Sequence, residues 1–313
     1  MNAAPITNLL ERLGHLFFYM VLKFCGLRCA YIFLYPVIFF YVLCSRKIHG
    51  ITSSYLKKRF PHFSNRQLFR ATFDNLFAFG QVLVDRAWLG LKENAEMTCT
   101  IDGKDDLFNT IAAGKGVVLV TAHVGPWQTA MAYLNVLPVK VHALMQYDQS
   151  AAAKHFFDLG KKNRHFNIID TESPFGGLVD AAAALQRGEI VTIMADRHIK
   201  GSTKEVEFLG NEVRLPDAAY TLAACFEAPV VVFLAAKTGT THFELKVWNT
   251  FYPRFEDRSN RDEVLRECCR KYAAALEQYV KKYPYQWYNF FEIWKQADVD
   301  SSSKAPITNT LQK

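Results

Sequence analysis

The chain has 313 residues, enough for one large domain or two modest ones with a substantial core. Half of the residues are hydrophobic and the formal net charge is +7, so nucleic acid, anionic lipid and an acidic carrier protein are the partners to consider. The sequence has no nucleic-acid-binding motif, which makes nucleic acid the least favoured of these. The seven cysteines form no CxxC pair, which argues against a disulfide framework or a zinc site.

The first expected element is an apolar segment at the N-terminus, residues 1–48. Its core at 29–44, CAYIFLYPVIFFYVLC, carries no charge, but it falls short of the ~20 residues that cross a bilayer as a helix. No small-residue cleavage site follows, so a cleaved signal peptide is disfavoured. The aromatic-rich composition favours a membrane-associated helix or helical hairpin lying in the inner leaflet, over the alternative of a buried core hairpin.

Strands and helices alternate after a helical stretch at 51–95. Apolar runs predict strands at 98–101, 116–121, 139–145, 167–170, 190–195 and 229–236, with 242–248 as an antiparallel partner of the last. Helices are expected at 107–113, 151–163, from Ser173 onward, at 216–226 and near the C-terminus. This pattern predicts an α/β fold with one domain at 49–296, whose mostly parallel or mixed central sheet is flanked by helices. The polar tail at 297–313 is expected to be disordered.

His123 is the most informative residue, because it comes two residues after the apolar strand at 116–121 and just before a Gly-Pro turn and a helix. The carboxyl ends of strands are where open α/β sheets bind their ligands. A base at that edge, next to the free N–H groups of a helix start, suits acyl or phosphoryl transfer. A single histidine at a strand end is also often purely structural, so its neighbours decide between the two readings.

Two further features of the sequence favour a site. Gln128 falls in the first turn of the helix after His123, from which its side chain can reach back to the imidazole. Asp196 and Arg197 end the strand at 190–195 and therefore lie on the same carboxyl edge. Arg197 is suited to a phosphate or carboxylate of a substrate, and the alternative for it is an ion pair with Asp196.

Four blocks in a fixed order resemble the bacterial lipid A biosynthesis acyltransferases, a branch of the lysophospholipid acyltransferase superfamily. They are HVGPWQ at 123–128, Asp196-Arg197 with Phe208-Leu209-Gly210, Leu215-Pro216 with Ala228-Pro229-Val230, and the PYQW segment at 284–287. Together with the hydrophobic N-terminus, the resemblance covers about residues 15 to 294.

The resemblance implies that His123 is the general base of an acyltransferase and that Gln128 and Arg197 assist it. The acyl donor would be an acyl carrier protein or acyl-CoA, and the acceptor a lipid or glycolipid such as a lipid A precursor or a lysolipid. Backbone N–H groups at 124–127 would hold the oxyanion. Residues expected to contact substrate are Asp196, Gly125, Trp127, Phe208, Gly210 and Pro216. No cofactor and no nucleic-acid partner is expected, and the histidines show no metal-ligand spacing. The resemblance implies a place on the cytoplasmic face of the inner membrane.

Gln128 departs from the family pattern, which has Asp or Glu at this position. An amide can orient the imidazole but brings no charge to stabilise its cation. Asp196 or Asp148 can supply the missing acid, or glutamine can be natural in a subfamily with another acceptor. The departure leaves two alternatives beside the acyltransferase: a catalytically reduced lipid-binding protein on the same fold, and an acyl thioesterase that uses water as acceptor.

Overall fold

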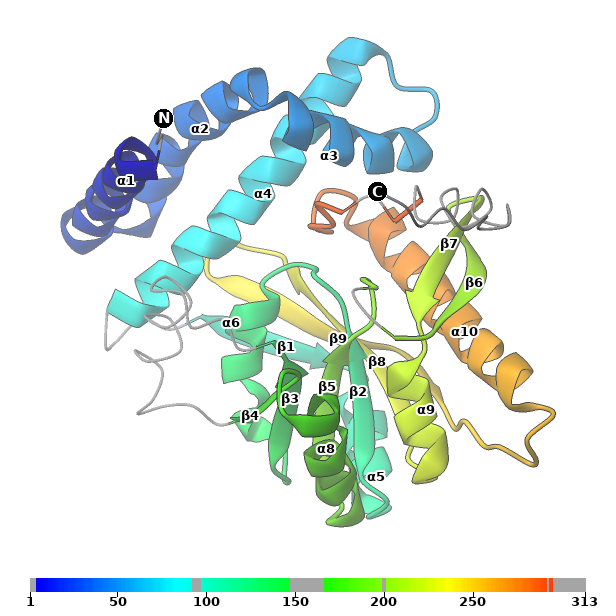
Figure 1. Cartoon of the computed structure of the whole chain (residues 1–313). Helices are drawn as coiled ribbons and strands as arrows, with labels where there is room; N and C mark the ends of the chain where they lie inside the picture. The colour runs from blue at the N-terminus through cyan, green and yellow to red at the C-terminus, as the bar shows by residue number, and fades with distance from the viewer. Residues whose placement is uncertain (1–3, 92–96, 147–165, 199–200, 292, 295–313) are drawn as a thin grey trace, which may run out of the picture.

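The computed structural model describes residues 4–91, 97–146, 166–198, 201–291 and 293–294. It confirms the expected fold class, a single α/β domain with a mixed central sheet, flanking helices and an apolar N-terminal helix (Figure 1). The helix expected at 151–163, Asp148 and the tail at 297–313 lie outside the described residues.

Four helices form the N-terminal part: α1 (Ala4–Phe24), α2 (Gly26–Cys44), α3 (Arg46–Arg59) and α4 (Asn65–Leu91). In Figure 1 α1 and α2 lie side by side, away from the sheet, and the long α4 connects them to it. The helix α2 has 19 residues and is long and apolar enough to cross a membrane. It is three residues longer than the uncharged run at 29–44, which by itself falls short of a membrane span. It lies close to α4, because Gly80 leaves room for Leu34: a Cβ at Gly80 would come within 2.9 Å of that side chain.

The central sheet has seven strands in the order β1-β9-β8-β2-β5-β3-β4. Their bounds are β1 Thr98–Asp102, β2 Val117–Thr121, β3 Val141–Met145, β4 Phe166–Asp170, β5 Ile190–Met194, β8 Val230–Lys237 and β9 His242–Phe251. The pair β8–β9 is antiparallel, as expected, and the remaining neighbours are parallel. Five strands therefore end at one edge of the sheet, and β2 and β8 are neighbours there.

Helices cover both faces of the sheet: α5 (Lys104–Ala112) and α6 (Trp127–Ala132) on one, and α8 (Leu178–Gln186), α9 (Ala218–Cys225) and α10 (Arg261–Lys282) on the other. Alternate residues of β2 point into the two cores, with Val118 and Val120 in one and Val117 and Leu119 in the other. Burial on both faces explains why this strand is a continuous apolar run. Short 3₁₀ helices lie at Leu134–Val136 and Pro174–Gly177.

A two-stranded hairpin, β6 (Thr203–Phe208) and β7 (Asn211–Pro216), lies against α10 outside the main sheet. Its turn contains Leu209 and Gly210, both with positive φ. Pro216 is the last residue of β7, so the expectation that a helix begins at Pro216 is wrong by two residues, and α9 begins at Ala218. A proline has no N–H to donate, which suits the end of a strand as well as the start of a helix.

Candidate active site

His123 lies two residues beyond β2, at the carboxyl edge of the sheet. The chain turns sharply after it at Gly125, where φ is +47°. A Cβ at Gly125 would lie 2.2 Å from the carbonyl oxygen of Ala235 in β8, so the close approach of this loop to the sheet requires glycine. The loop is thereby held at a fixed place on the edge, and the imidazole with it.

Asp196 lies beside His123 because the strands that precede them are parallel neighbours in register. Thr121 of β2 pairs with Met194 of β5, and each chain then continues by two residues to its functional side chain. The Nδ1 of His123 is 2.9 Å from Oδ1 of Asp196, and the backbone N–H of His123 donates to Oδ2 at 3.1 Å. The carboxylate is fully buried, whereas the imidazole is 22% exposed.

A third donor reaches the same carboxylate from the C-terminal segment. The indole N–H of Trp287 donates to Oδ2 of Asp196 at 3.1 Å. Burial by itself would raise the pKa of this carboxyl, but the nearby His123 and the Arg197 guanidinium lower the pKa to about 2. The ionised carboxylate accepts the Nδ1–H of His123, which leaves Nε2 as the nitrogen that can take up a proton.

Gln128 is not the partner of this ring, contrary to the expectation from its spacing. Its Oε1 accepts a hydrogen bond of 2.7 Å from Nη1 of Arg86, a residue of α4. The side chain lies in the first turn of α6 and is directed to α4, while Asp196 occupies the Nδ1 side of the imidazole. This chain lacks the acid that the family pattern has at position 128, and the carboxylate that contacts the ring comes from Asp196, after β5. Nothing in the sequence marks Arg86 as a partner of Gln128, because most of the residues around it in α4 are apolar.

Arg197 lies next to the His123 loop without contacting the ring. Its Nη2 donates to the carbonyl oxygen of Tyr288 at 2.7 Å, and the N–H of Tyr288 donates to the carbonyl oxygen of His123 at 2.8 Å. Burial lowers the pKa of the Arg197 guanidinium, and the charge of Asp196 opposes that shift. Arg197 is half-buried, at the border between the site and the C-terminal segment.

The other residues expected to contact substrate fall into two groups. Trp127 lies at the site, with its ring centroid 5.7 Å from that of His123. Phe208 is fully buried against Trp287, behind the Asp196 carboxylate. Gly210 lies in the exposed turn of the β6–β7 hairpin and Pro216 at the end of β7. The structure therefore gathers Trp127, Gly125 and Asp196 around His123 and places the hairpin residues outside that group.

The N–H groups expected to form an oxyanion hole are partly occupied. Val124 donates to the carbonyl oxygen of Ala122 at 2.8 Å, and Gly125 to that of Gln286 at 2.8 Å. Pro126 has no N–H to offer. Most of the stretch at 124–127 therefore serves to hold the loop in place.

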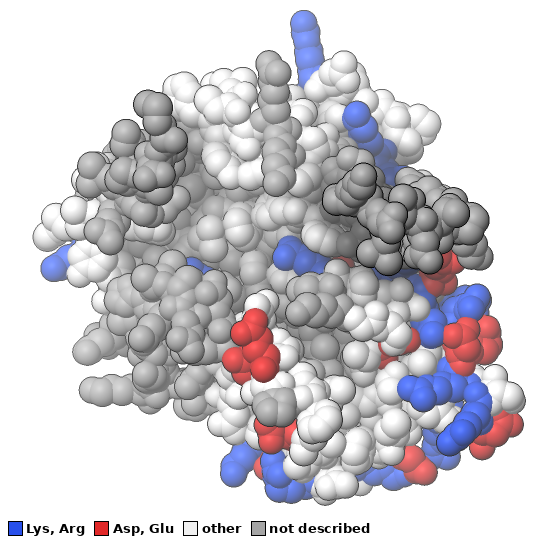
Figure 2. All heavy atoms as spheres, viewed as in Figure 1, with Lys and Arg blue, Asp and Glu red and all other residues white. Residues whose placement is uncertain are grey.

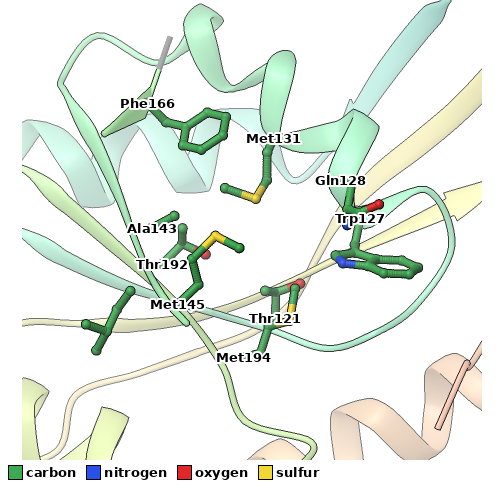
Figure 3. Close-up of a pocket in the computed structure, with 10 residues that line it drawn as sticks. Thr121, Trp127, Gln128, Met131, Ala143, Met145, Phe166, Thr192 and Met194 are labelled. Carbon is green, nitrogen blue, oxygen red and sulfur yellow. The ribbon is translucent and has the colours of Figure 1, made fainter. Parts of the chain in front are cut away.

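A narrow apolar pocket with a cavity volume of about 50 Å³ opens next to this group, at the carboxyl ends of β2, β3 and β5. Trp127 and Gln128 form one wall, so the pocket borders the residues around His123. Figure 3 shows Met131 of α6, Met145 of β3 and Phe166 of β4 lining one common space, with Thr121 and Met194 at the strand ends. Methionine side chains are unbranched and adaptable, so such a lining can accommodate a flexible apolar ligand.

Comparison with known proteins agrees with the resemblance in the sequence. The family model described as bacterial lipid A biosynthesis acyltransferase matches residues 54–296. That span includes the central sheet, His123, Asp196 and Trp287. A search among curated proteins gives no match. Since the family model covers most of the chain, the protein belongs to the bacterial lipid A biosynthesis acyltransferase family and is an acyltransferase that acts on lipid.

Proposed function

We propose that this protein transfers a fatty acyl group from an acyl thioester to a lipid or glycolipid acceptor, such as a lipid A precursor or a lysolipid, with His123 as the general base. The observation that carries this proposal is the hydrogen bond between His123 Nδ1 and the ionised, fully buried Asp196. It leaves Nε2 for proton transfer, beside an apolar pocket at the sheet edge where α/β proteins bind ligands.

In the proposed reaction, Nε2 of His123 accepts the proton of an acceptor hydroxyl or amine as that group attacks the carbonyl carbon of the thioester. The new bond to carbon forms, the carbon–sulfur bond breaks, and the leaving thiolate takes the proton from the imidazolium. The negative charge of Asp196 stabilises the imidazolium between these steps. Arg197, next to the loop, is proposed to pair with a phosphate or carboxylate of a substrate.

The apolar pocket is suited to the fatty acyl chain of the donor. Half of its lining consists of methionine, leucine and phenylalanine side chains, from α6, β3, β4 and β5. An acyl chain that enters it past Trp127 brings its thioester carbonyl toward His123, because the two rings are in contact. We propose acyl carrier protein or acyl-CoA as the donor, and transfer assays with each of them distinguish the two.

We further propose that the chain is attached to the cytoplasmic face of the inner membrane through α1 and α2. The outward side of these helices carries large apolar side chains, among them Phe24, Ile32 and Phe40. In Figure 2 a cluster of Lys, Arg, Asp and Glu side chains lies on the right of the viewed face, over β6, β7 and α10. All seven cysteines are free thiols, as suits a reducing compartment.

The geometry bears on the two alternatives. The alternative of a catalytically reduced lipid-binding protein depends on the lack of an acid at position 128, and the hydrogen bond between Asp196 and the ring of His123 supports a working base instead. A thioesterase would differ from the acyltransferase only in using water as the acceptor, so the reaction products distinguish the two. Consumption of donor without a new acylated lipid identifies a thioesterase.

The test is acyl transfer by the full chain in vesicles, with acyl carrier protein or coenzyme A as carrier and a lipid A precursor or a lysolipid as acceptor. His123→Ala is expected to lower kcat by about 10³-fold or more. The matched control is His142→Ala, because His142 has a carboxylate partner of its own, Glu189, at 2.8 Å, but lies at the opposite ends of the strands. This control is expected to keep the wild-type rate. A His123→Ala variant as active as wild type would overturn the proposal.

A further inference from the structure

The segment at 286–288, which follows α10, pairs with the loop that carries His123. Val124 and Trp287 form an isolated antiparallel bridge, flanked on either side by a main-chain hydrogen bond of 2.8 Å between the segment and the loop. Two hydrogen bonds around one bridge join the segment and the loop into a single unit. A shift of the segment would therefore move the loop and the imidazole with it.

The same segment is held from two further elements of the fold. Asn75 of α4 is buried, and its Nδ2 donates to the carbonyl oxygen of Trp287 at 3.0 Å and to that of Tyr285 at 3.1 Å. The side-chain amide of Gln286 pairs with the main chain of Lys237 in β8, accepting from its N–H and donating to its carbonyl oxygen, both at 2.8 Å. The main chain at Trp287 is thereby fixed from α4 and β8 as well as from the loop.

The ring of Trp287 is placed as precisely as its main chain. It is fully buried and lies edge-on to the rings of Tyr55 and Phe208, with centroids 4.8 and 5.3 Å away. In this position its indole N–H donates to Oδ2 of Asp196 at 3.1 Å. Trp294 packs 6.3 Å from Trp287, yet its indole N–H has no partner among the described residues. Packing in this aromatic cluster does not by itself direct an indole N–H to an acceptor.

The donors to the Asp196 carboxylate come from two residues in the described part of the chain. His123 provides its ring Nδ1–H to Oδ1 and its main-chain N–H to Oδ2. The indole of Trp287 provides the third, also to Oδ2. Within this group, Trp287 is the donor that is independent of the catalytic histidine, so it can hold the carboxylate while the imidazole gains and loses its proton.

The other titratable groups near Asp196 donate elsewhere. Arg197 acts on the carboxylate by its charge, but its Nη2 donates to the carbonyl oxygen of Tyr288. Tyr272 of α10 donates its hydroxyl to the carbonyl oxygen of Thr121 at 3.1 Å, and burial raises its pKa well above the usual range, so it stays neutral. Neither group replaces the hydrogen bond from the indole.

We propose that Trp287 is a positioning residue of the reaction, whose indole N–H holds the Asp196 carboxylate against the ring of His123 and takes up part of its negative charge. This inference rests on the acyl-transfer function proposed above. Without the indole N–H, more of the charge of Asp196 acts on the imidazolium, so the ring takes up its proton at a higher pH. The carboxylate also loses the bond that fixes its orientation.

The first test follows the imidazole directly, by NMR titration of the full chain in lipid nanodiscs with ¹³C-labelled histidine. The spectrum of His123→Ala identifies the signal of His123. In Trp287→Phe, the midpoint of the His123 titration is expected to move up by about 0.5–1 pH unit, roughly threefold to tenfold in proton affinity. Trp294→Phe is the matched control, because it makes the same change in the same aromatic cluster but removes an indole N–H without a partner among the described residues. This control is expected to titrate like wild type.

The second test separates positioning from binding. In transfer assays Trp287→Phe is expected to lower kcat about tenfold at unchanged KM, because the buried indole contacts Asp196 and not a substrate. The acid limb of the pH profile of kcat should move up by the same amount as the titration of His123. Trp294→Phe is expected to keep both the wild-type kcat and the wild-type profile.

A measurement without any change at Trp287 decides the case in which Trp287→Phe does not fold. The chain has five tryptophans, so single Phe variants of the other four assign the indole signal of Trp287 in ¹⁵N-tryptophan spectra. This indole proton is expected downfield of that of Trp294, since its acceptor is a carboxylate. Asp196→Asn removes that charge and should move the Trp287 signal upfield while the Trp294 signal stays in place.

The proposal is overturned if His123 titrates in Trp287→Phe as in wild type, or if Trp294→Phe shifts the titration equally. It is also overturned if Trp287→Phe acts through KM alone, or if Asp196→Asn leaves the indole signal of Trp287 unchanged. Because the NMR measurements need no turnover, they are independent of the proposed reaction. An unshifted titration, with transfer that depends on His123, rejects the role of Trp287 alone. A shifted titration, with transfer unaffected by His123→Ala, rejects the proposed base alone.

Discussion

His123 is joined to Asp196 by two hydrogen bonds, one from the ring and one from its own backbone. Nδ1 lies 2.9 Å from Oδ1, and the main-chain N–H lies 3.1 Å from Oδ2. The carboxylate therefore fixes both the position of the residue and the tautomer of its ring. Trp287 adds a third donor from a segment more than ninety positions away in the sequence, so the pair is held by two strands and by the C-terminal segment.

Replacing the carboxylate is expected to cost most of the activity. Asp196→Asn preserves the shape of the side chain but removes the charge that stabilises the imidazolium, so we expect kcat to fall by about 10²-fold to 10⁴-fold. The matched control is Asp217→Asn, because Asp217 is also a fully buried carboxylate but pairs with Lys204, away from His123. Thermal unfolding of both variants shows whether they fold. A kcat within the wild-type range for Asp196→Asn would contradict the assigned pairing.

Asp196 should also make stability depend on acid pH. Its pKa is lowered from 3.8 to about 2, so the folded state binds this proton less readily than the unfolded state does. The stabilisation, on the order of 2 kcal/mol, is fully present above the unfolded pKa and is lost as the pH falls through the folded pKa. Denaturant unfolding from about pH 6 down to about pH 2 should show the stability difference between wild type and Asp196→Asn narrowing below about pH 4. A difference that stays constant over this range would refute the assignment.

Gln128 is expected to act through Arg86 and not through the ring. Gln128→Leu removes one hydrogen-bond acceptor of the half-buried Arg86 guanidinium and should lower the free energy of unfolding by about 1–3 kcal/mol, with a loss of activity. Gln128→Glu gives Arg86 a charged acceptor and the family's usual acid, so it should retain or raise activity. The control is Gln278→Leu on the exposed side of α10, which should match wild type. Equal rates and stabilities for the three forms at position 128 would remove Gln128 from the mechanism.

The size of the apolar pocket should set the length of the transferred chain. Met145 lines it at the end of β3. Met145→Trp fills the pocket and should shift transfer toward shorter acyl chains, whereas Met145→Ala enlarges it and should shift transfer toward longer ones. Pocket changes of this size alter selectivity by about tenfold or more. Competition between donors of different length, read by mass spectrometry of the product, measures the shift. If the preferred acyl-chain length shifts in the same direction in both variants, or does not shift, the acyl chain binds elsewhere.

The outward side of α1 and α2 should carry the membrane attachment. Phe24, Ile32 and Phe40 are each at least 64% exposed, so changing all three to Glu should disturb the core little while opposing insertion into lipid. The triple variant is expected to move from the membrane fraction to the supernatant on sedimentation.

The matched control changes Phe175, Val179 and Tyr252 to Glu, because these side chains are as exposed but lie in the sheet domain. It is expected to sediment like wild type. If both triple variants stay with the membranes, the attachment does not depend on this side of α1 and α2.

Local pattern alone was enough to predict most of the secondary structure and the edge of the sheet that carries the site. The apolar run of β2 ends at His123 and that of β5 ends before Asp196, so both residues were expected at carboxyl ends of strands. The buried side of α10 was likewise readable from helical spacing, since Leu265, Cys268 and Tyr272 are all buried. The β6–β7 hairpin was not predicted, because the block that contains Gly210 was identified only by its resemblance to the family.

The tertiary structure alone decided which residues meet. β2 and β5 are neighbours although β3 and β4 lie between them in the chain, and that strand order places Asp196 on the ring of His123. The same packing brings α4 next to α6, so that Arg86 donates a hydrogen bond to the side-chain oxygen of Gln128. The spacing in the sequence had instead predicted that Gln128 contacts the ring of His123. Periodicity and chain spacing report which side of an element is buried and where it ends. The choice of neighbour comes from long-range packing of whole elements, which no local stretch of sequence encodes.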